Sequence, residues 1–188
     1  ANLQRSKYKE FPHMQNWTYN EFKHCGVDYS DAGQVAKYED RHRRFRNFDN
    51  EFTGMLDFTG LNDTSGMTVI DLGCGTGVFP VLASKRFKKV YAVDVSEVML
   101  GHARGKAKEA GVSNVEFVNA GFLTYEHKSG QADLVMTKAA LHHLPDFWKQ
   151  VALLNMNRML KTDGILYLHD VVFHFEPAEY AGKINGYL

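Results

Sequence analysis

The feature that most constrains this chain is a hydrophobic run, residues 67–72, that carries Asp71 and leads directly into Gly73-Cys74-Gly75-Thr76-Gly77. An amphipathic segment, residues 78–87, follows the glycines. A buried strand that turns sharply into a helix produces this pattern, because glycine adopts positive φ and leaves a bare backbone that a ligand can approach closely. The pattern therefore predicts a strand, a ligand-contacting turn and a helix in succession.

A second predicted strand, residues 89–93, ends at Asp94, which lies 23 residues after Asp71. An acidic side chain at the tip of the second strand is well placed to accept hydrogen bonds from both hydroxyls of a ribose. Together with the glycine turn, Asp94 predicts a cofactor that contains a nucleoside, bound in a βαβ unit.

The spacing of the glycines narrows the choice of cofactor. A dinucleotide fingerprint has the spacing G-x-G-x-x-G and places a pyrophosphate at the helix N-terminus. Here the spacing is G-x-G-x-G, and Pro80 occupies the position of the late glycine. The sequence also lacks the G-x-x-x-x-G-K-[ST] pattern of a phosphate-binding loop. These observations weigh against a dinucleotide and against a nucleoside triphosphate.

Residues 71–77 and Val93-Asp94-Val95-Ser96 resemble the motifs of the class I S-adenosylmethionine-dependent methyltransferases. The resemblance implies that Asp94 binds the ribose and that the glycine turn meets the methionine part of the cofactor. It also implies that Asp71 contacts the ammonium group, directly or through water. The cofactor would then be S-adenosylmethionine and the product S-adenosylhomocysteine.

The resemblance extends over roughly residues 66–172. The segments that carry it further are similar to the third strand and its turn (115–118 and 119–122), the fourth strand and its turn (132–137 and 140–146) and the entry to the fifth strand (159–168). Five elements in the right order are a more specific signal than the glycine loop alone. The Ala-Leu-His-His-Leu-Pro segment, 140–145, is similar to the small-molecule methyltransferases of ubiquinone and menaquinone biosynthesis.

These positions define the candidate site. For cofactor binding they are Asp71, Gly73, Cys74, Gly75, Gly77, Asp94, Val95, Met99, Gly121, Phe122 and Lys138, and for catalysis His142 and His143. A histidine near the transferred methyl group could take a proton from the acceptor. The alternative for the histidine pair is structural, with one ring capping the turn before Pro145 and the other packing. Met99 likewise fits either adenine packing or the helix–sheet core.

Two departures from the family pattern stand out. Gly121 occupies the position where the family usually has an acid that bonds the adenine amino group, so we expect the backbone near Phe122 and apolar packing to hold adenine instead. Nothing after Val172 resembles the two closing strands of the usual seven-stranded sheet. We expect that the natural chain continues beyond Leu188.

The alternation of predicted strands and helices indicates an α/β fold, a Rossmann-like doubly wound parallel sheet with strand order 3-2-1-4-5. The predicted strands are 68–72, 89–93, 115–118, 132–136 and 164–172, and the predicted helices are 77–87, 96–110 and 146–160. Residues 66–188 would form this domain. Residues 1–65 would form an N-terminal helical lid rich in aromatic side chains, with one helix over 34–56.

Composition limits the partners. Lys plus Arg equals Asp plus Glu, at 22 each, so the chain lacks the basic excess of a protein that grips nucleic acid. The one basic cluster (Arg41, Arg43, Arg44 and Arg46) fits the solvated face of a helix. No apolar stretch approaches the roughly 20 residues of a membrane span. Cys25 and Cys74 suggest no disulfide framework, so we expect a cytoplasmic protein. A homodimer is left open.

A metal centre at His142, His169, Asp170 and His174 is not favoured, because adjacent residues of a strand point to opposite faces. Asp170 alone is a candidate for facing the substrate. The sequence therefore predicts a methyltransferase that acts on a small-molecule acceptor. Three alternatives stay open: a methyltransferase acting on RNA or protein, a nicotinamide-dependent oxidoreductase, and a module that binds the cofactor without catalysis.

Overall fold

The computed structural model describes residues 17–23, 33, 35, 46–172 and 174–185. Its elements in chain order are α2 (Phe48–Thr59), β1 (Thr68–Leu72), α3 (Val78–Ser84), β2 (Lys89–Asp94), α4 (Glu97–Glu109), β3 (Val115–Asn119), β4 (Ala132–Lys138), η1 (Leu141–His143), α5 (Asp146–Met159), β5 (Leu160–His169), η2 (Pro177–Glu179) and α6 (Tyr180–Asn185). Cys25, Arg41, Arg43 and Arg44 lie outside the described residues.

The five strands form one parallel sheet in the order β3-β2-β1-β4-β5, which confirms the predicted topology. Val69 of β1 lies opposite Val90 of β2 on one side and Leu134 of β4 on the other. The strand order therefore reverses between β1 and β4. Ligands of open α/β sheets bind beyond the carboxyl ends of the strands at such a switch point.

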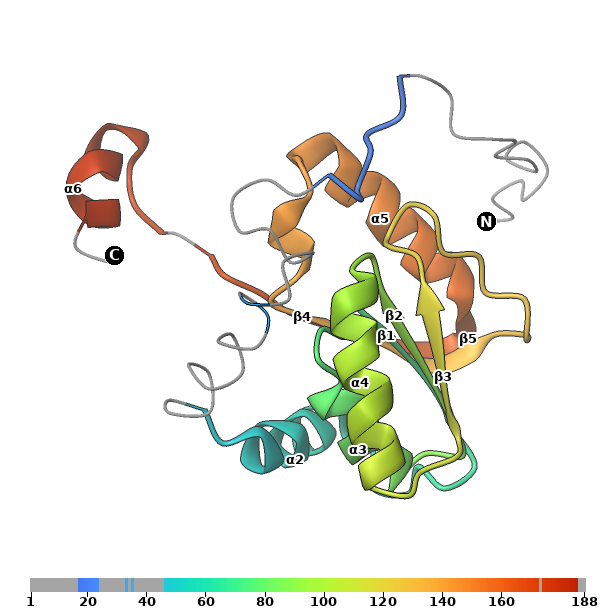
Figure 1. The fold of residues 1–188 in the computed structure, drawn as a ribbon. Helices are drawn as coiled ribbons and strands as arrows, with labels where there is room; N and C mark the ends of the chain where they lie inside the picture. The colour runs from blue at the N-terminus through green and yellow to red at the C-terminus, as the bar shows by residue number, and fades with distance from the viewer. Residues whose placement is uncertain (1–16, 24–32, 34, 36–45, 173, 186–188) are drawn as a thin grey trace.

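Helices lie on both faces of the sheet (Figure 1). Alternate residues of the central strands pack in two different core clusters, one on each face. Ile70 of β1 packs in one cluster with Met156 of α5. Its neighbour Val69 packs on the opposite face, with Phe52 of α2 and Phe79 of α3. Because both faces are covered, the central strands are buried almost throughout, and the sheet is a rigid base for side chains at its carboxyl edge.

The N-terminal helix differs from the prediction of one helix over 34–56. Arg46 and Asn47 are not helical, and α2 begins at Phe48 and continues beyond Leu56 to Thr59. The side chain of Asn47 caps α2 by accepting a hydrogen bond of 3.0 Å from the backbone N–H of Asn50. This cap satisfies a backbone donor that the first turn leaves free, and it fixes Asn47 as the residue at which α2 begins. Residues 34 and 36–45 of the predicted helix lie outside the described part of the chain.

The fifth strand also begins earlier than predicted. The predicted bounds of 164–172 are wrong at both ends, because β5 starts at Leu160 and ends at His169. Leu160 lies opposite Ala132 and Ile165 opposite Leu134, so residues 161–164 bulge against Asp133 alone. Lys161 Nζ bonds Asp133 Oδ1 at 2.6 Å, which fastens this bulge to β4. The predicted third helix also ends early, at Met159, and the first, α3, ends at Ser84.

The segment after β5 contains η2 and α6, and no further strand follows β5 among residues 170–172 and 174–185. Figure 1 shows α6 standing apart from the sheet. None of the helices in the described part of the chain has both the length and the apolar character needed to span a membrane.

Candidate active site

Two adjoining cavities open where the strands end, on either side of the glycine turn. Gly73, Gly75 and Ala139 line both cavities. Ala139, directly after β4, has φ 51°, a conformation that non-glycine residues adopt rarely and chiefly where function or tight packing requires it. The turns after β1 and β4 thus form a common wall between the two cavities.

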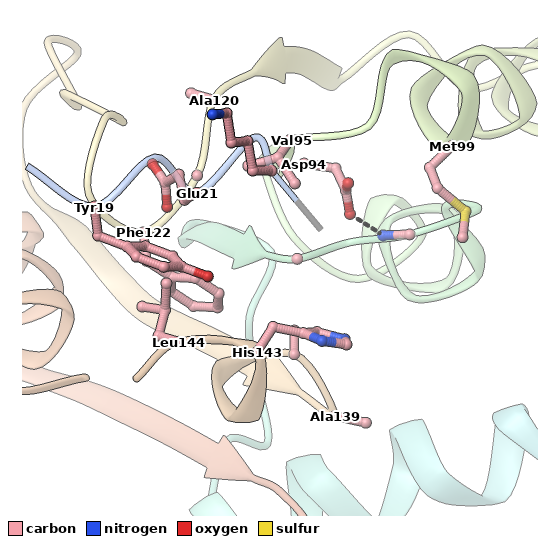
Figure 2. A pocket seen from close by; sticks show the side chains of 15 residues that line it. Tyr19, Glu21, Asp94, Val95, Met99, Ala120, Phe122, Ala139, His143 and Leu144 are labelled. Carbon is pink, nitrogen blue, oxygen red and sulfur yellow. Dashed lines mark hydrogen bonds between the residues drawn. The ribbon is translucent and has the colours of Figure 1, made fainter. Parts of the chain in front are cut away.

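The first cavity brings together the predicted ribose and adenine residues (Figure 2). Asp94, at the end of β2, is 8% exposed, and its carboxylate accepts two backbone hydrogen bonds. Gly75 N donates to Oδ2 at 2.8 Å, and Ser96 N donates to Oδ1 at 2.8 Å. These bonds fix the orientation of the carboxylate at the cavity wall. A carboxylate that accepts hydrogen bonds from two hydroxyl groups needs such a fixed orientation.

Apolar side chains complete the base-binding end of the first cavity. Val95 lines it from the turn between β2 and α4, Met99 from the first turn of α4, and Gly121 and Phe122 from the turn after β3. All four were predicted. Three further lining residues, Tyr19, Glu21 and Lys23, come from the N-terminal region, and no local sequence signal identifies Glu21.

The predicted glycines have different surroundings. Gly75 has φ 55°, and a Cβ there would meet no atom within 4 Å, so its free face is open toward the cavities that it lines. Gly77 has φ 81°, but a Cβ there would lie 2.5 Å from the Cβ of Ala103 in α4. Gly77 lines neither cavity and serves the close packing of the turn against α4.

Asp71 and Cys74 line the second cavity. Two charged residues also line it: Arg46, just before α2, and Lys138, at the end of β4. Asp71 is 4% exposed, and burial, with repulsion from Asp94, raises the pKa of Asp71 to about 7. Burial also raises the pKa of the Cys74 thiol well above its usual value, so Cys74 is a neutral wall residue rather than a nucleophile. Lys138 lines this cavity too, with its Nζ 5.2 Å from the ring centroid of Phe79.

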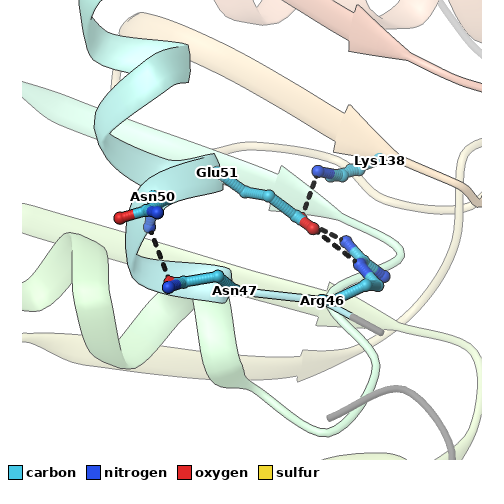
Figure 3. Close-up of polar contacts among 5 residues, drawn as sticks. All are labelled: Arg46, Asn47, Asn50, Glu51 and Lys138. Carbon is cyan, nitrogen blue, oxygen red and sulfur yellow. Dashed lines mark hydrogen bonds and ion pairs between the residues drawn. The ribbon is translucent and has the colours of Figure 1, made fainter. Parts of the chain in front are cut away.

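A cluster of three charges flanks the second cavity (Figure 3). Glu51 of α2 accepts hydrogen bonds from Arg46 at 3.0 and 2.6 Å and from Lys138 Nζ at 2.5 Å. The hydrogen bond with Arg46, supported by Lys138, lowers the pKa of Glu51 to about 2 although partial burial opposes the shift. The cluster joins the start of α2 to the end of β4 with two cations and one anion.

Arg46 was predicted to lie on a solvated helix face, and this prediction is wrong. Its side chain is 23% exposed and lines the second cavity. The signal that could have found it is the helix start beside it, Asn47 followed by Asp49 and Glu51 in the first turn. That pattern places Arg46 just before the helix rather than on its surface.

The two histidines lie in different surroundings. His143 lines the first cavity, whereas His142 lines neither cavity. Asp170 holds His142 instead, with its Oδ1 2.6 Å from the ring Nδ1 and its Oδ2 accepting from the backbone N–H at 3.0 Å. Burial works to raise the pKa of Asp170, but these bonds and one from Val171 N hold it below its usual range. Among the described residues, no group of His, Cys, Asp and Glu side chains could hold a metal ion.

Comparisons with known proteins match the same region. Residues 69–164 match the methyltransferase domain family. (S)-coclaurine N-methyltransferase of Papaver somniferum is 27% identical over 130 residues, which cover 65% of this chain and 36% of that protein. Demethylmenaquinone methyltransferase of Lactococcus lactis is 32% identical over 107 residues, covering 55% of this chain and 42% of that protein. The YcgJ protein of Bacillus subtilis has a solved structure that superimposes with a TM-score of 0.62 and 26% identity, covering 72% of this chain and 58% of that one.

The chain thus spans less than half the length of each of these two named enzymes. The matched residues run from β1 into β5, and they carry the glycine turn, Asp71 and Asp94. The predicted resemblance is confirmed: the chain belongs to the class I S-adenosylmethionine-dependent methyltransferase family.

Proposed function

We propose that this protein binds S-adenosylmethionine across the two cavities and transfers its methyl group to a small-molecule acceptor. The observation that carries the proposal is the placement of two buried acids on either side of one open glycine. Asp94 lies in the first cavity, Asp71 in the second, and Gly75 lines both. A ligand with ribose hydroxyls and an ammonium group matches these two acids.

The second cavity suits the zwitterionic end of an amino acid. Asp71 would hold the ammonium group of the ligand. Burial favours the neutral form of Asp71, whereas the positive charge of the bound ammonium would favour the ionised form. Arg46 and Lys138, which both pair with Glu51, bring cationic groups to the wall of the cavity. These groups would attract the carboxylate of the ligand.

The bound cofactor would supply an electrophilic methyl group on its sulfonium: the acceptor atom bonds to the methyl carbon in line as the carbon–sulfur bond breaks and S-adenosylhomocysteine leaves. The contribution of the chain is to orient the reactants and to keep water away. Gly73, Gly75 and Ala139, which line both cavities, lie where the reacting centre would sit. His143 lines the first cavity and would accept the proton that a hydroxyl or amine acceptor loses. His142, bound to Asp170, would support the turn on which His143 stands.

The N-terminal region would close the site. Tyr19, Glu21 and Lys23 line the first cavity, although they lie about a hundred residues or more from most of the other lining positions. This supports the lid that was predicted for residues 1–65, in its described part 17–23. Acceptor binding would then depend on residues outside the sheet, which differ among enzymes that share this fold.

The names of the relatives favour a small acceptor. One methylates the nitrogen of coclaurine and another acts on demethylmenaquinone, according to their names. The equal numbers of basic and acidic residues also weigh against a nucleic acid substrate.

The test uses S-adenosylmethionine with a radioactive methyl group, offered with catechols, secondary amines, bulk RNA and a protein extract. Label should appear in a small-molecule product, and His143→Ala should lower turnover about 100-fold or more without changing the affinity for S-adenosylhomocysteine. His142→Ala is the matched control and should lower turnover less. Label in RNA or protein, or tight binding of NAD without binding of S-adenosylhomocysteine, would contradict the proposal.

A further inference from the structure

Glu21 lines the first cavity and is buried there, although it is distant in sequence from the strands and turns that form the rest of the site. Glu21 belongs to the described segment 17–23, yet it is only 7% exposed and contacts the turn after β3. Figure 2 shows Glu21 beside Ala120 and Phe122, on the opposite side of the cavity from His143. Burying a carboxylate carries a large desolvation cost, so its position needs compensating partners.

The turn after β3 supplies these partners, and most of their hydrogen bonds go to Oε1 of Glu21. Oε1 accepts hydrogen bonds from Thr124 N at 2.9 Å and from Thr124 Oγ1 at 2.7 Å. Leu123 N donates to both oxygens, at 3.1 Å each. The backbone N–H of Phe122 adds a weaker interaction with the carboxylate. An ionised carboxylate offers about four acceptor positions, and Oε2 shares the Leu123 donor with Oε1, so Oε2 keeps capacity for one more donor.

Gly121 shows where Oε2 lies. A Cβ added at Gly121 would overlap the Cδ and Oε2 atoms of Glu21 and the Cγ1 atom of Val95. No positive φ requires glycine at this position, so the requirement comes from the space that Glu21 fills. The carboxylate of an N-terminal residue thus occupies the place of a side chain at position 121, at the end of the cavity bounded by Val95 and Phe122.

We infer that Glu21 is a specificity residue for the base of the cofactor, with Oε2 accepting a hydrogen bond from the exocyclic amino group of adenine. The inference rests on the proposed function, and it replaces the expectation that backbone and packing alone hold the base. An ionised carboxylate only accepts hydrogen bonds, so it favours a 6-amino purine and repels a 6-oxo purine. Val95, Met99 and Phe122 supply the apolar walls on which a flat base can rest.

The charge balance of Glu21 is consistent with such a donor. Burial raises the pKa of Glu21, and the bonds from Thr124, Leu123 and Phe122 oppose that shift without cancelling it. An additional N–H donor would favour the ionised form further. Ligand binding would therefore also hold the N-terminal segment against the turn after β3.

The test compares S-adenosylhomocysteine with its 6-oxo analogue, S-inosylhomocysteine, by calorimetry on the full chain. We expect the unaltered protein to prefer the 6-amino ligand by about tenfold or more, and Glu21→Ala to reduce the preference to about threefold or less. Glu21→Gln should remove or reverse it, because the amide can keep Oε1 on Thr124 and turn its NH₂ toward the base. Glu126→Gln is the matched control, since its side chain is 70% exposed, and it should keep the preference.

A swap of position gives a second test. Gly121→Asp alone should weaken both ligands, because the new side chain meets Glu21. Combining it with Glu21→Gly should restore the preference for the 6-amino ligand. The ratio of the two affinities is measured within each variant, so a loss of stability does not obscure it. An intact preference in Glu21→Ala would overturn the assignment of Glu21, whereas failure of the unaltered protein to bind either ligand would overturn the proposed function.

Discussion

The backbone N–H of Gly75 donates a hydrogen bond of 2.8 Å to Oδ2 of Asp94, across 19 residues of sequence. This bond ties the glycine turn after β1 to the tip of β2. The residue that would bind ribose therefore also positions the backbone that would meet the methionine part of the cofactor. Changes at either residue should affect the binding of the whole ligand.

Gly75→Val should abolish binding of S-adenosylhomocysteine, because the added side chain points into the open space shared by the two cavities. Its positive φ also costs about 1–2 kcal/mol of stability for a residue with a Cβ. Gly111→Val is the matched control, since Gly111 has φ 65°, has open space around it and lines neither cavity. Thermal unfolding should show similar losses for both variants, and calorimetry should show lost binding for Gly75→Val alone. Equal binding by both would remove the glycine turn from the site.

Asp71 should make ligand affinity depend on pH. Its pKa of about 7 in the free protein means that it is largely protonated below pH 7, while an ammonium ligand requires the ionised form. Affinity for S-adenosylhomocysteine should therefore fall by up to about tenfold per pH unit below pH 7. Asp71→Asn should bind more weakly at pH 8 and should lose this dependence, as calorimetry between pH 5.5 and 8 would show. A variant with the same pH profile as the unaltered protein would exclude Asp71 as the group responsible.

The same residue should reduce stability at higher pH. The folded pKa of Asp71 lies above the usual value of 3.8, so the folded state binds more protons and loses stability as pH rises from about 4 to 7. Asp71→Asn removes the buried charge, so its free energy of unfolding should exceed that of the unaltered protein at pH 8. Urea denaturation at pH 5 and pH 8 measures the difference, and a variant that is less stable at pH 8 contradicts the assignment.

Glu51 should show the opposite dependence. Its folded pKa of about 2 lies below the usual 4.5, so its ion pairs contribute stability above pH 4.5 that is lost as pH falls toward 2. Glu51→Gln should lower the free energy of unfolding by about 1–2 kcal/mol at pH 7, with a smaller difference at pH 3. Glu97→Gln, which breaks the more exposed pair with Arg104, should cost less than about 0.5 kcal/mol. Equal losses at pH 7 and pH 3 would show that Glu51 acts through packing rather than charge.

The sheet and most of its edge could be predicted from sequence because their signals are local. A buried strand is recognised in the sequence as a run of apolar residues. An acid or glycine that directly follows such a strand lies at the carboxyl edge of a parallel sheet. The sequence therefore predicts both the location and the chemical role of Asp71, Gly75 and Asp94. The order of the strands followed from the alternation and the family motifs.

The N-terminal contributions could not be predicted in the same way. Glu21 reaches its place through bonds to Leu123 and Thr124, about a hundred residues away, and such pairing leaves no periodic pattern. Arg46 was misplaced because aromatic residues on both sides of it continue one helical stripe, whereas the cap at Asn47 ends that regularity. Tertiary contacts determine the position of Glu21, and the cap at Asn47 determines that of Arg46. Both effects outweigh the helical periodicity of the sequence.

The most direct test of the account is calorimetry of S-adenosylhomocysteine with the unaltered protein, Asp94→Ala and the exposed control Asp57→Ala, with NAD as the competing ligand class. Asp94→Ala loses two charge-assisted bonds to the ribose and the bond that orders Gly75, so binding should weaken by about 2–4 kcal/mol. The control should bind like the unaltered protein, and NAD should bind none of the three. Equal affinity of Asp94→Ala and the unaltered protein for S-adenosylhomocysteine, or a preference of the unaltered protein for NAD, would contradict the account.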